Sequence, residues 1–137
     1  MARRVLFLCT HNSARSQMAE GLLQHLGHGL FEVESAGTQA TAVRSEAIVA
    51  MRELGIDISG KRSKTLDAFV AQPFDLVITV CDDANESCPF FPNARERRHW
   101  SVPDPSKTEG DDRTRLAAFR AARDELRSRI ERELLTT

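Results

Sequence analysis

A stretch near the start of the chain reads as a buried strand, a tight loop and the start of a helix, and it limits the fold more than any other feature. Val5 to Leu8 form a continuous apolar run, which is typical of a strand covered on both faces. Apolar residues then recur at helical spacing, among them Met18, Leu22 and Leu26. A buried strand that passes directly into a helix favours an α/β fold with parallel strands.

The loop between this strand and helix carries Cys9 and Arg15 in a Cys-x5-Arg pattern. A loop at a helix N-terminus can turn its backbone N–H groups inward and bind an oxyanion, helped by the positive end of the helix dipole. The same field favours the thiolate of Cys9, which is the nucleophilic form. The Arg15 guanidinium can hold two oxygens of a tetrahedral anion at once. The predicted oxyanion-binding residues are Thr10, His11, Asn12, Ser13, Ala14, Arg15 and Ser16.

An isolated cysteine at the end of an apolar strand is more often a small buried hydrophobe than a nucleophile. Here polar residues surround the thiol and Arg15 has the right spacing. The segment also lies at a strand-to-helix switch, where α/β folds place ligands. We therefore interpret Cys9 as reactive.

Residues 9–20 resemble the active-site loop of the low-molecular-weight tyrosine phosphatase fold. They are more closely similar to the thioredoxin-coupled arsenate reductases built on that fold, and the resemblance covers nearly the whole chain. Members of this family commonly have Gly at the position of His11 and a second Cys at the position of Ala14. The second difference removes any disulfide within the loop, so a resolving thiol must come from elsewhere.

Length and charge narrow the class of protein. The chain of 137 residues predicts a single domain over 1–137, and its net charge of −1 gives no basis for binding nucleic acid or a membrane surface. We expect no signal peptide, and the sequence has no apolar run long enough to span a bilayer. The three cysteines are an odd number, which favours reactive thiols in a reducing cytoplasm over a secreted disulfide scaffold. We expect a monomer.

Two further cysteines follow a second buried strand. The run from Phe74 to Val80 ends at Cys81, and Cys88 comes after a polar segment. In a parallel sheet Cys81 would lie at the same edge as Cys9. A zinc site is disfavoured, because a Cys-x6-Cys pair without paired histidines lies outside the usual ligand spacing, and we predict no metal.

The resemblance to the reductases implies an order for the three thiols. Reduction of arsenate takes two electrons, which a thiol pair supplies by becoming a disulfide. In this order Cys9 attacks arsenic, Cys81 attacks Cys9 and releases arsenite, and Cys88 attacks Cys81. Thioredoxin would then reduce the Cys81–Cys88 disulfide.

Asp104 is the predicted general acid. We expect a last strand over Arg98–Val102, followed by Pro103-Asp104-Pro105, and the resemblance places the acid at this Asp-Pro. Asp-Pro is also a common turn dipeptide, and only its place after the last strand raises it above that. Related phosphatases have aromatic residues after Asp-Pro, whereas this chain has Ser106 and no tyrosine at all. The pocket therefore suits a small free anion: arsenate, with phosphate or sulfate able to occupy it.

Some reductases of this type bind potassium beside the loop, through residues that match Asn12, Glu20 and Ser35. Their remaining ligands, a Thr and an Asp, align here with Arg62 and Lys64. A Lys64 ammonium in the cation's position could pair with Glu20, so we predict no potassium requirement; the alternative is that both are ordinary surface charges. The predicted supporting residues are Asn12, Ser16, Glu20, Ser35 and Lys64.

The remaining segments complete the expected fold. We predict a helix over 44–54, a short helix capped by Ser63, and a long amphipathic helix over 113–134. The fold class is a single α/β domain of the low-molecular-weight tyrosine phosphatase type. Its four-stranded parallel sheet is flanked by helices on both faces.

The leading functional hypothesis is a thioredoxin-coupled arsenate reductase without a tightly bound cofactor. A low-molecular-weight tyrosine phosphatase is the alternative, because Cys9, Arg15 and Asp104 suffice for that chemistry. For the same reason a reductase of this type is expected to have a weak phosphatase side activity. A reductase coupled to glutaredoxin or to a low-molecular-weight thiol also remains open. A non-catalytic oxyanion-binding or thiol-sensing module is disfavoured, since nucleophile, Arg and acid are all present.

Overall fold

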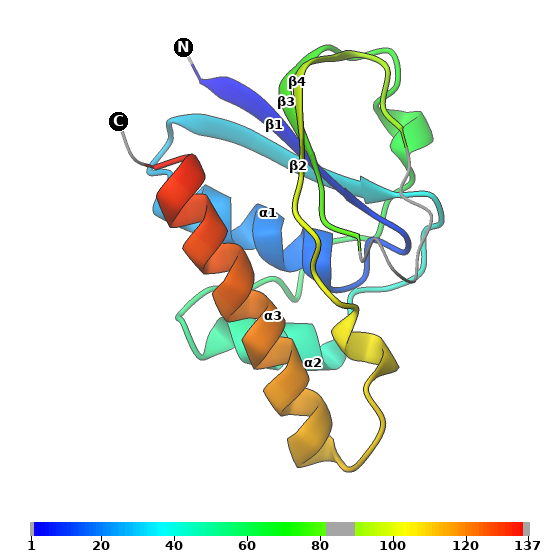
Figure 1. Cartoon of the computed structure of the whole chain (residues 1–137), viewed down its shortest axis with the longest axis vertical. Coiled ribbons are helices and arrows are strands. Elements are labelled where there is room, and N and C mark those ends of the chain that lie inside the picture. The colour runs from blue at the N-terminus through cyan, green and yellow to red at the C-terminus, as the bar shows by residue number, and fades with distance from the viewer. Residues whose placement is uncertain (1, 82–89, 136–137) are drawn as a thin grey trace.

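Strands and helices alternate in the first part of the chain, and a long helix ends it (Figure 1). The structure is a computed structural model that describes residues 2–81 and 90–135. Within those stretches no helix is both long and apolar enough to cross a membrane. The elements are β1 (Arg3–Cys9), α1 (Arg15–Leu26), β2 (Phe31–Gly37), α2 (Ser45–Arg52), the 3-10 helix η1 (Leu66–Ala68), β3 (Phe74–Thr79), β4 (Ala94–His99), the 3-10 helix η2 (Pro105–Lys107) and α3 (Asp112–Glu133).

The sheet has the strand order β2-β1-β3-β4, and all its pairings are parallel. β1 and β3 are the inner strands, which is why both are almost continuously apolar. Cys9 pairs with Gly37, and Leu8 pairs with Thr79. The strands therefore end in step, and the residues that follow them meet at one edge of the sheet.

Each face of the sheet has its own hydrophobic core. On one face Phe7 packs with residues of α1, α2 and α3, including Met18, Met51 and Leu126, and Figure 1 shows the three helices gathered on this side. On the other face Leu6 and Leu8 pack with the aromatic cluster Phe69, Phe74 and Phe91 beside η1. Helical structure thus covers both faces as expected, with the single-turn η1 on the second face of the described chain.

The edge strand β4 lies four residues earlier than the predicted strand over Arg98–Val102. β4 runs from Ala94 to His99 with the sequence Ala-Arg-Glu-Arg-Arg-His. A charged edge strand with much of its length exposed shows no apolar alternation, so it gives no periodic signal. The apolar residues Trp100 and Val102 come after the strand and are buried, and Trp100 lies against Phe7 with ring centroids 5.9 Å apart.

The ion pairs of Glu53 with Arg120 and Arg123, where α2 meets α3, should affect the stability of the protein at acid pH. Hydrogen bonds from Arg120, and then from Arg123, lower the pKa of Glu53 from 4.5 to about 2. A carboxylate whose pKa is lowered by folding stabilises the native state above its ordinary pKa, and loses this effect as the pH falls through the folded value. Between pH 4.5 and about 2, wild type should therefore lose stability more steeply than Glu53→Gln. Urea midpoints followed by circular dichroism at several pH values test this.

Glu131→Gln is the control for this comparison. It removes a longer ion pair within α3, with Arg127 at 3.7 Å, and should follow wild type more closely than Glu53→Gln does. Parallel loss of stability in wild type and Glu53→Gln would contradict the prediction.

Candidate active site

Cys9 is the last residue of β1 and is only 2% exposed. The backbone N–H of Asn12 donates to its Sγ at 3.2 Å, and the Ser16 hydroxyl lies 2.8 Å from the same sulfur. Hydrogen-bond donors aimed at a sulfur stabilise its anionic form. The local geometry therefore suits a thiolate.

The carbonyl groups of the loop between Cys9 and α1 accept hydrogen bonds that hold the loop in place. Each carbonyl from residue 10 to residue 14 accepts a hydrogen bond from the protein around the loop or from α1. The donors, in order, are Gln39 N, Ser63 Oγ, Gln17 Nε2, Arg44 N and Met18 N. Because C=O and N–H point in opposite directions across a trans peptide, the N–H groups of this loop are turned to its inner side. Such a concave set of N–H groups at a helix N-terminus is suited to an oxyanion.

Asn12 fixes the shape of this loop. Its φ of 50° lies in the left-handed region, which Asn tolerates better than most residues. Its side-chain Oδ1 accepts from the backbone N–H of Lys64 and from Gln17 Nε2, both at 2.8 Å. Its Nδ2 therefore faces the hydroxyls of Ser16 and Ser35, to which it donates at 2.8 and 2.9 Å.

Arg15 and Asp104 lie close together. Arg15 begins α1 and is 3% exposed; its Nη1 donates to the Val102 carbonyl at 3.0 Å. Its Nη2 lies 3.7 Å from Oδ2 of Asp104, whose side chain is 8% exposed. The backbone N–H and the hydroxyl of Ser106 both donate to the other carboxylate oxygen of Asp104. The predicted anion fork and the predicted acid are thus brought together.

Cys81 lies at the same edge of the sheet as Cys9. It lies two residues after the end of β3, and the N–H of the intervening Val80 donates to the carbonyl of Leu8 at 2.8 Å. Both Cys9 and Cys81 are thiols, and Cys81 is fully buried. The carbonyl of Cys81 accepts from the N–H of Val102 at 3.4 Å. The carbonyl of the same Val102 accepts from Arg15, so Val102 links Cys81 to Arg15. Cys88 lies outside the described residues.

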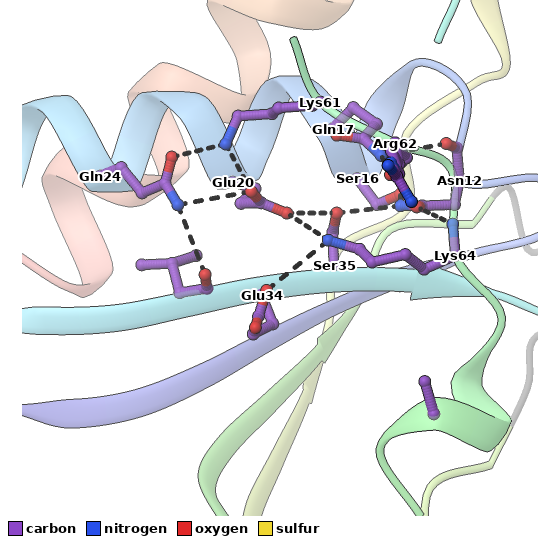
Figure 2. A network of polar contacts seen from close by, with 12 residues as sticks. Asn12, Ser16, Gln17, Glu20, Gln24, Glu34, Ser35, Lys61, Arg62 and Lys64 are labelled. Carbon is purple, nitrogen blue, oxygen red and sulfur yellow. Dashed lines mark hydrogen bonds and ion pairs between the residues drawn. The ribbon is translucent and has the colours of Figure 1, made fainter. Parts of the chain in front are cut away.

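A polar network extends from the loop to the surface (Figure 2). The Ser35 hydroxyl donates to Oε1 of Glu20, a carboxylate buried to 3% exposure. Lys64 Nζ lies 3.5 Å from Glu20 Oε1 and 3.6 Å from Glu34 Oε1. The structure therefore contains the predicted contact between Lys64 and Glu20. It also contains a shorter one that sequence reasoning missed, from Lys61 Nζ to Glu20 Oε2 at 2.5 Å.

Other residues of the site also escaped sequence reasoning. Gln17 donates both to Asn12 and to the carbonyl of Arg62, and so joins the loop to the 61–64 segment. Ser63 caps no helix: its hydroxyl bridges Thr41 N–H and the carbonyl of His11. The short η1 begins instead after Thr65 and has no capping side chain. The contact of Gln17 with Arg62 and the contacts of Ser63 join residues far apart in sequence, so no local pattern indicates them.

Gly37 is required at the end of β2 because the active-site loop passes directly against it. A Cβ at this position would lie 2.6 Å from the Thr10 carbonyl oxygen and 2.8 Å from the Asn12 nitrogen. Since both are backbone atoms, they cannot rotate away. We expect Gly37→Ala to cost about 3 kcal/mol of unfolding free energy, as overpacking does when nothing can yield, and to slow alkylation of Cys9. Urea denaturation and the iodoacetamide rate measure the two effects.

Gly60→Ala is the matched control, because a Cβ there meets nothing within 4 Å. It should retain wild-type stability and wild-type reactivity of Cys9. Equal stability of the two alanine variants would show that the loop does not need the close approach at Gly37.

Comparisons with known proteins agree with this geometry. A curated "Arsenate reductase" of Halalkalibacterium halodurans is 47% identical over 126 residues, covering 92% of this chain and 91% of the relative. A solved structure described as an arsenate reductase in the phosphate binding state superimposes with a TM-score of 0.81, at 35% identity and 95% coverage of both chains. A Corynebacterium glutamicum thioredoxin-dependent arsenate reductase superimposes with a TM-score of 0.65, at 29% identity, over 95% of this chain and 62% of that one.

The sequence profile of the low molecular weight phosphotyrosine protein phosphatases matches residues 4–137, which include every site residue named above. With the parallel sheet, the loop around Cys9 and the nearby Asp104 in place, the chain belongs to the low molecular weight phosphotyrosine protein phosphatase family.

Proposed function

We propose that this protein reduces arsenate to arsenite. The observation that carries the proposal is the pair of buried thiols, Cys9 and Cys81, at the ends of adjacent strands beside an oxyanion-binding loop. Hydrolysis of a phosphate ester needs one nucleophilic thiol, whereas reduction of arsenate needs a pair. The relatives named as arsenate reductases support this choice.

The first step makes a covalent adduct. The Cys9 thiolate attacks As(V), and an oxygen leaves as water after accepting a proton from Asp104. Arg15 and the inner N–H groups of the loop hold the remaining oxygens and stabilise the charge that develops on them. The contacts from Asn12 N–H and Ser16 to Cys9 support its role as the attacking thiolate.

The second step reduces arsenic. The Cys81 thiolate attacks the sulfur of Cys9, the S–As bond breaks, and its electron pair remains on arsenic as As(III). Arsenite leaves, and Cys9 and Cys81 are oxidised to a disulfide. Because both residues are buried, a protein reductant has no direct access to this bond, and Cys88 is proposed to attack Cys81 and carry the oxidation to a Cys81–Cys88 disulfide.

Thioredoxin is the proposed electron donor. Its dithiol would reduce the Cys81–Cys88 disulfide and become a disulfide itself, which balances the two electrons taken by arsenic. The similarity to a structure named as a thioredoxin-dependent arsenate reductase supports this donor. A cytoplasmic setting, where thioredoxin is kept reduced, follows from the same proposal.

Arsenate-dependent oxidation of NADPH in the presence of thioredoxin and thioredoxin reductase tests the proposal. We expect sustained turnover of the purified wild-type chain. Turnover only when glutaredoxin and glutathione replace thioredoxin would overturn the choice of donor. No arsenite formation with either donor would overturn arsenate reduction itself.

A weak phosphatase activity is a second proposed reaction of the same site. The Asp104 side chain lies beside Arg15, where its protonated carboxylic acid form can give a proton to the leaving oxygen of an aryl phosphate bound to the loop. Hydrolysis of an aryl phosphate that is lost in Cys9→Ser and retained in Cys81→Ser would separate this activity from reduction.

The site is also proposed to need no potassium. The ammonium groups of Lys64 and Lys61 both lie beside the buried Glu20 carboxylate, and they supply positive charge where a bound cation would otherwise do so. Equal turnover in potassium and in a bulky organic cation of the same ionic strength is the expected result.

A further inference from the structure

Lys61 makes the shortest ion pair of the network below the active-site loop. Its Nζ lies 2.5 Å from Oε2 of Glu20 and donates to Oε1 of Gln24 at 2.7 Å. Gln24 lies one helical turn after Glu20 and donates back to the same carboxylate at 3.3 Å. The three side chains therefore form a closed set of contacts, which Figure 2 shows between α1 and the segment that carries Lys61. Lys64 is farther away and is shared with Glu34.

An ionised carboxylate accepts hydrogen bonds and donates none. While Glu20 is ionised, the hydroxyl hydrogen of Ser35 is directed to Glu20 Oε1, and the Ser35 oxygen is left to accept from Asn12 Nδ2. Asn12 cannot turn over, because the Lys64 backbone N–H holds its Oδ1. The ionised Glu20 carboxylate therefore determines which groups donate and which accept in the hydrogen bonds from Ser35 to Asn12.

The same reasoning extends from Asn12 to the nucleophile. The second hydrogen of Asn12 Nδ2 is donated to Ser16 Oγ at 2.8 Å. The hydroxyl hydrogen of Ser16 is then available for Cys9 Sγ, also 2.8 Å away. Without the Lys61 ammonium and its short contact, the buried Glu20 carboxylate would keep only the longer contact to Lys64, and we expect its side chain to shift from this position. Ser35 would then no longer be held as a donor to Glu20, and the contact that places Asn12 would weaken.

We propose that Lys61 is a positioning residue for Cys9. It keeps Glu20 as an acceptor, and through Ser35, Asn12 and Ser16 it maintains the hydrogen bond that stabilises the Cys9 thiolate. This inference rests on the proposed function only in that Cys9 is taken as the nucleophile. Lys61 itself touches neither the sulfur nor the oxyanion loop.

The test uses the alkylation rate of Cys9, which requires no arsenate. With Cys81 and Cys88 changed to serine, Cys9 is the only thiol in the chain, and iodoacetamide at pH 7 reports its reactivity. Lys61→Met should slow this alkylation by about tenfold, because residues of one hydrogen-bonded network are strongly coupled. Lys61→Arg should retain most of the rate, since it keeps the positive charge. In the native three-cysteine chain, Lys61→Met should lower kcat for arsenate more than it raises KM.

A double variant separates positioning from simple loss of stability. Lys61→Met/Glu20→Gln removes the ammonium together with the carboxylate that needs it, and the Gln oxygen can still accept from Ser35. We expect its Cys9 to react at close to the wild-type rate. Should Lys61→Met fail to fold, this double variant carries the test: a rate near wild type supports the proposal, and a tenfold slower one overturns it.

Arg129→Met is the control for removing an ion-paired cation elsewhere. Arg129 pairs with Glu125 at 2.8 Å on α3, and its loss should leave Cys9 reactivity unchanged. Wild-type alkylation in Lys61→Met would overturn the proposal. Failure of arsenate turnover in the wild-type chain would instead overturn the proposed function, and the alkylation comparison would keep its meaning.

Discussion

Replacing Cys88 with serine is expected to limit arsenate reduction to about one arsenite per enzyme molecule, because each turnover oxidises two thiols and the disulfide must then be passed on. In the variant, Cys9 and Cys81 would remain joined after the first arsenite leaves. Both residues are buried in the reduced protein, so thioredoxin should reduce their disulfide slowly. Quenched-flow measurement of arsenite, followed by counting of alkylatable thiols, detects the burst and the trapped disulfide.

Ser87→Ala is the matched control, since it changes the neighbouring position and removes no thiol. It should turn over continuously with thioredoxin. Sustained turnover of Cys88→Ser at the wild-type rate would show that thioredoxin reaches the first disulfide directly, and the third thiol would then have no place in the cycle.

Replacing Arg15 with lysine is expected to lower kcat/KM for arsenate by about 10²–10³-fold, the range typical of losing one oxyanion-stabilising donor. The guanidinium of Arg15 is buried, with Nη1 on the Val102 carbonyl and Nη2 facing Asp104. A lysine ammonium is a point charge and cannot hold a backbone carbonyl and two anion oxygens in one plane. The variant keeps the Cys9 thiol, so the lower kcat/KM should come mainly from weaker arsenate binding and a slower first chemical step.

Protection by phosphate provides an independent measurement for this variant. In wild type, phosphate should slow the alkylation of Cys9 by occupying the loop, and Arg15→Lys should require a much higher phosphate concentration for the same effect. Arg98→Lys, which alters surface ion pairs with Glu96 and Glu133, is the control and should resemble wild type. Equal protection in Arg15→Lys and wild type would contradict the role assigned to the fork.

The features that the sequence predicts well are those that local patterns encode. The buried strand before Cys9, the helix after it and the parallel sheet follow from apolar runs and helical spacing, and the structure confirms them. The approach of Asp104 to Arg15 is a different case. It was expected from resemblance to a family rather than from a pattern, because the two residues are far apart in sequence.

The features that the sequence does not reveal depend on tertiary contacts. β4 is an edge strand and carries charges along most of its length, so the apolar pattern predicts the strand four residues too late, toward the buried Trp100 and Val102 that follow it. The position of Ser63 before a short helix predicts a cap, yet its hydroxyl holds the active-site loop instead. Lys61 has no local signal at all, since only the fold places its ammonium against a carboxylate on α1.

Trp100 gives the enzyme an intrinsic optical probe. It is the only tryptophan in a chain that has no tyrosine, so the indole fluorescence of the protein comes from one ring. That ring is 1% exposed, and its backbone N–H donates to the carbonyl of Thr79, next to the strand ends that lead into Cys9 and Cys81. We expect formation of a disulfide at this edge to alter the packing of the indole, and fluorescence would then follow the redox state of an unlabelled preparation in real time.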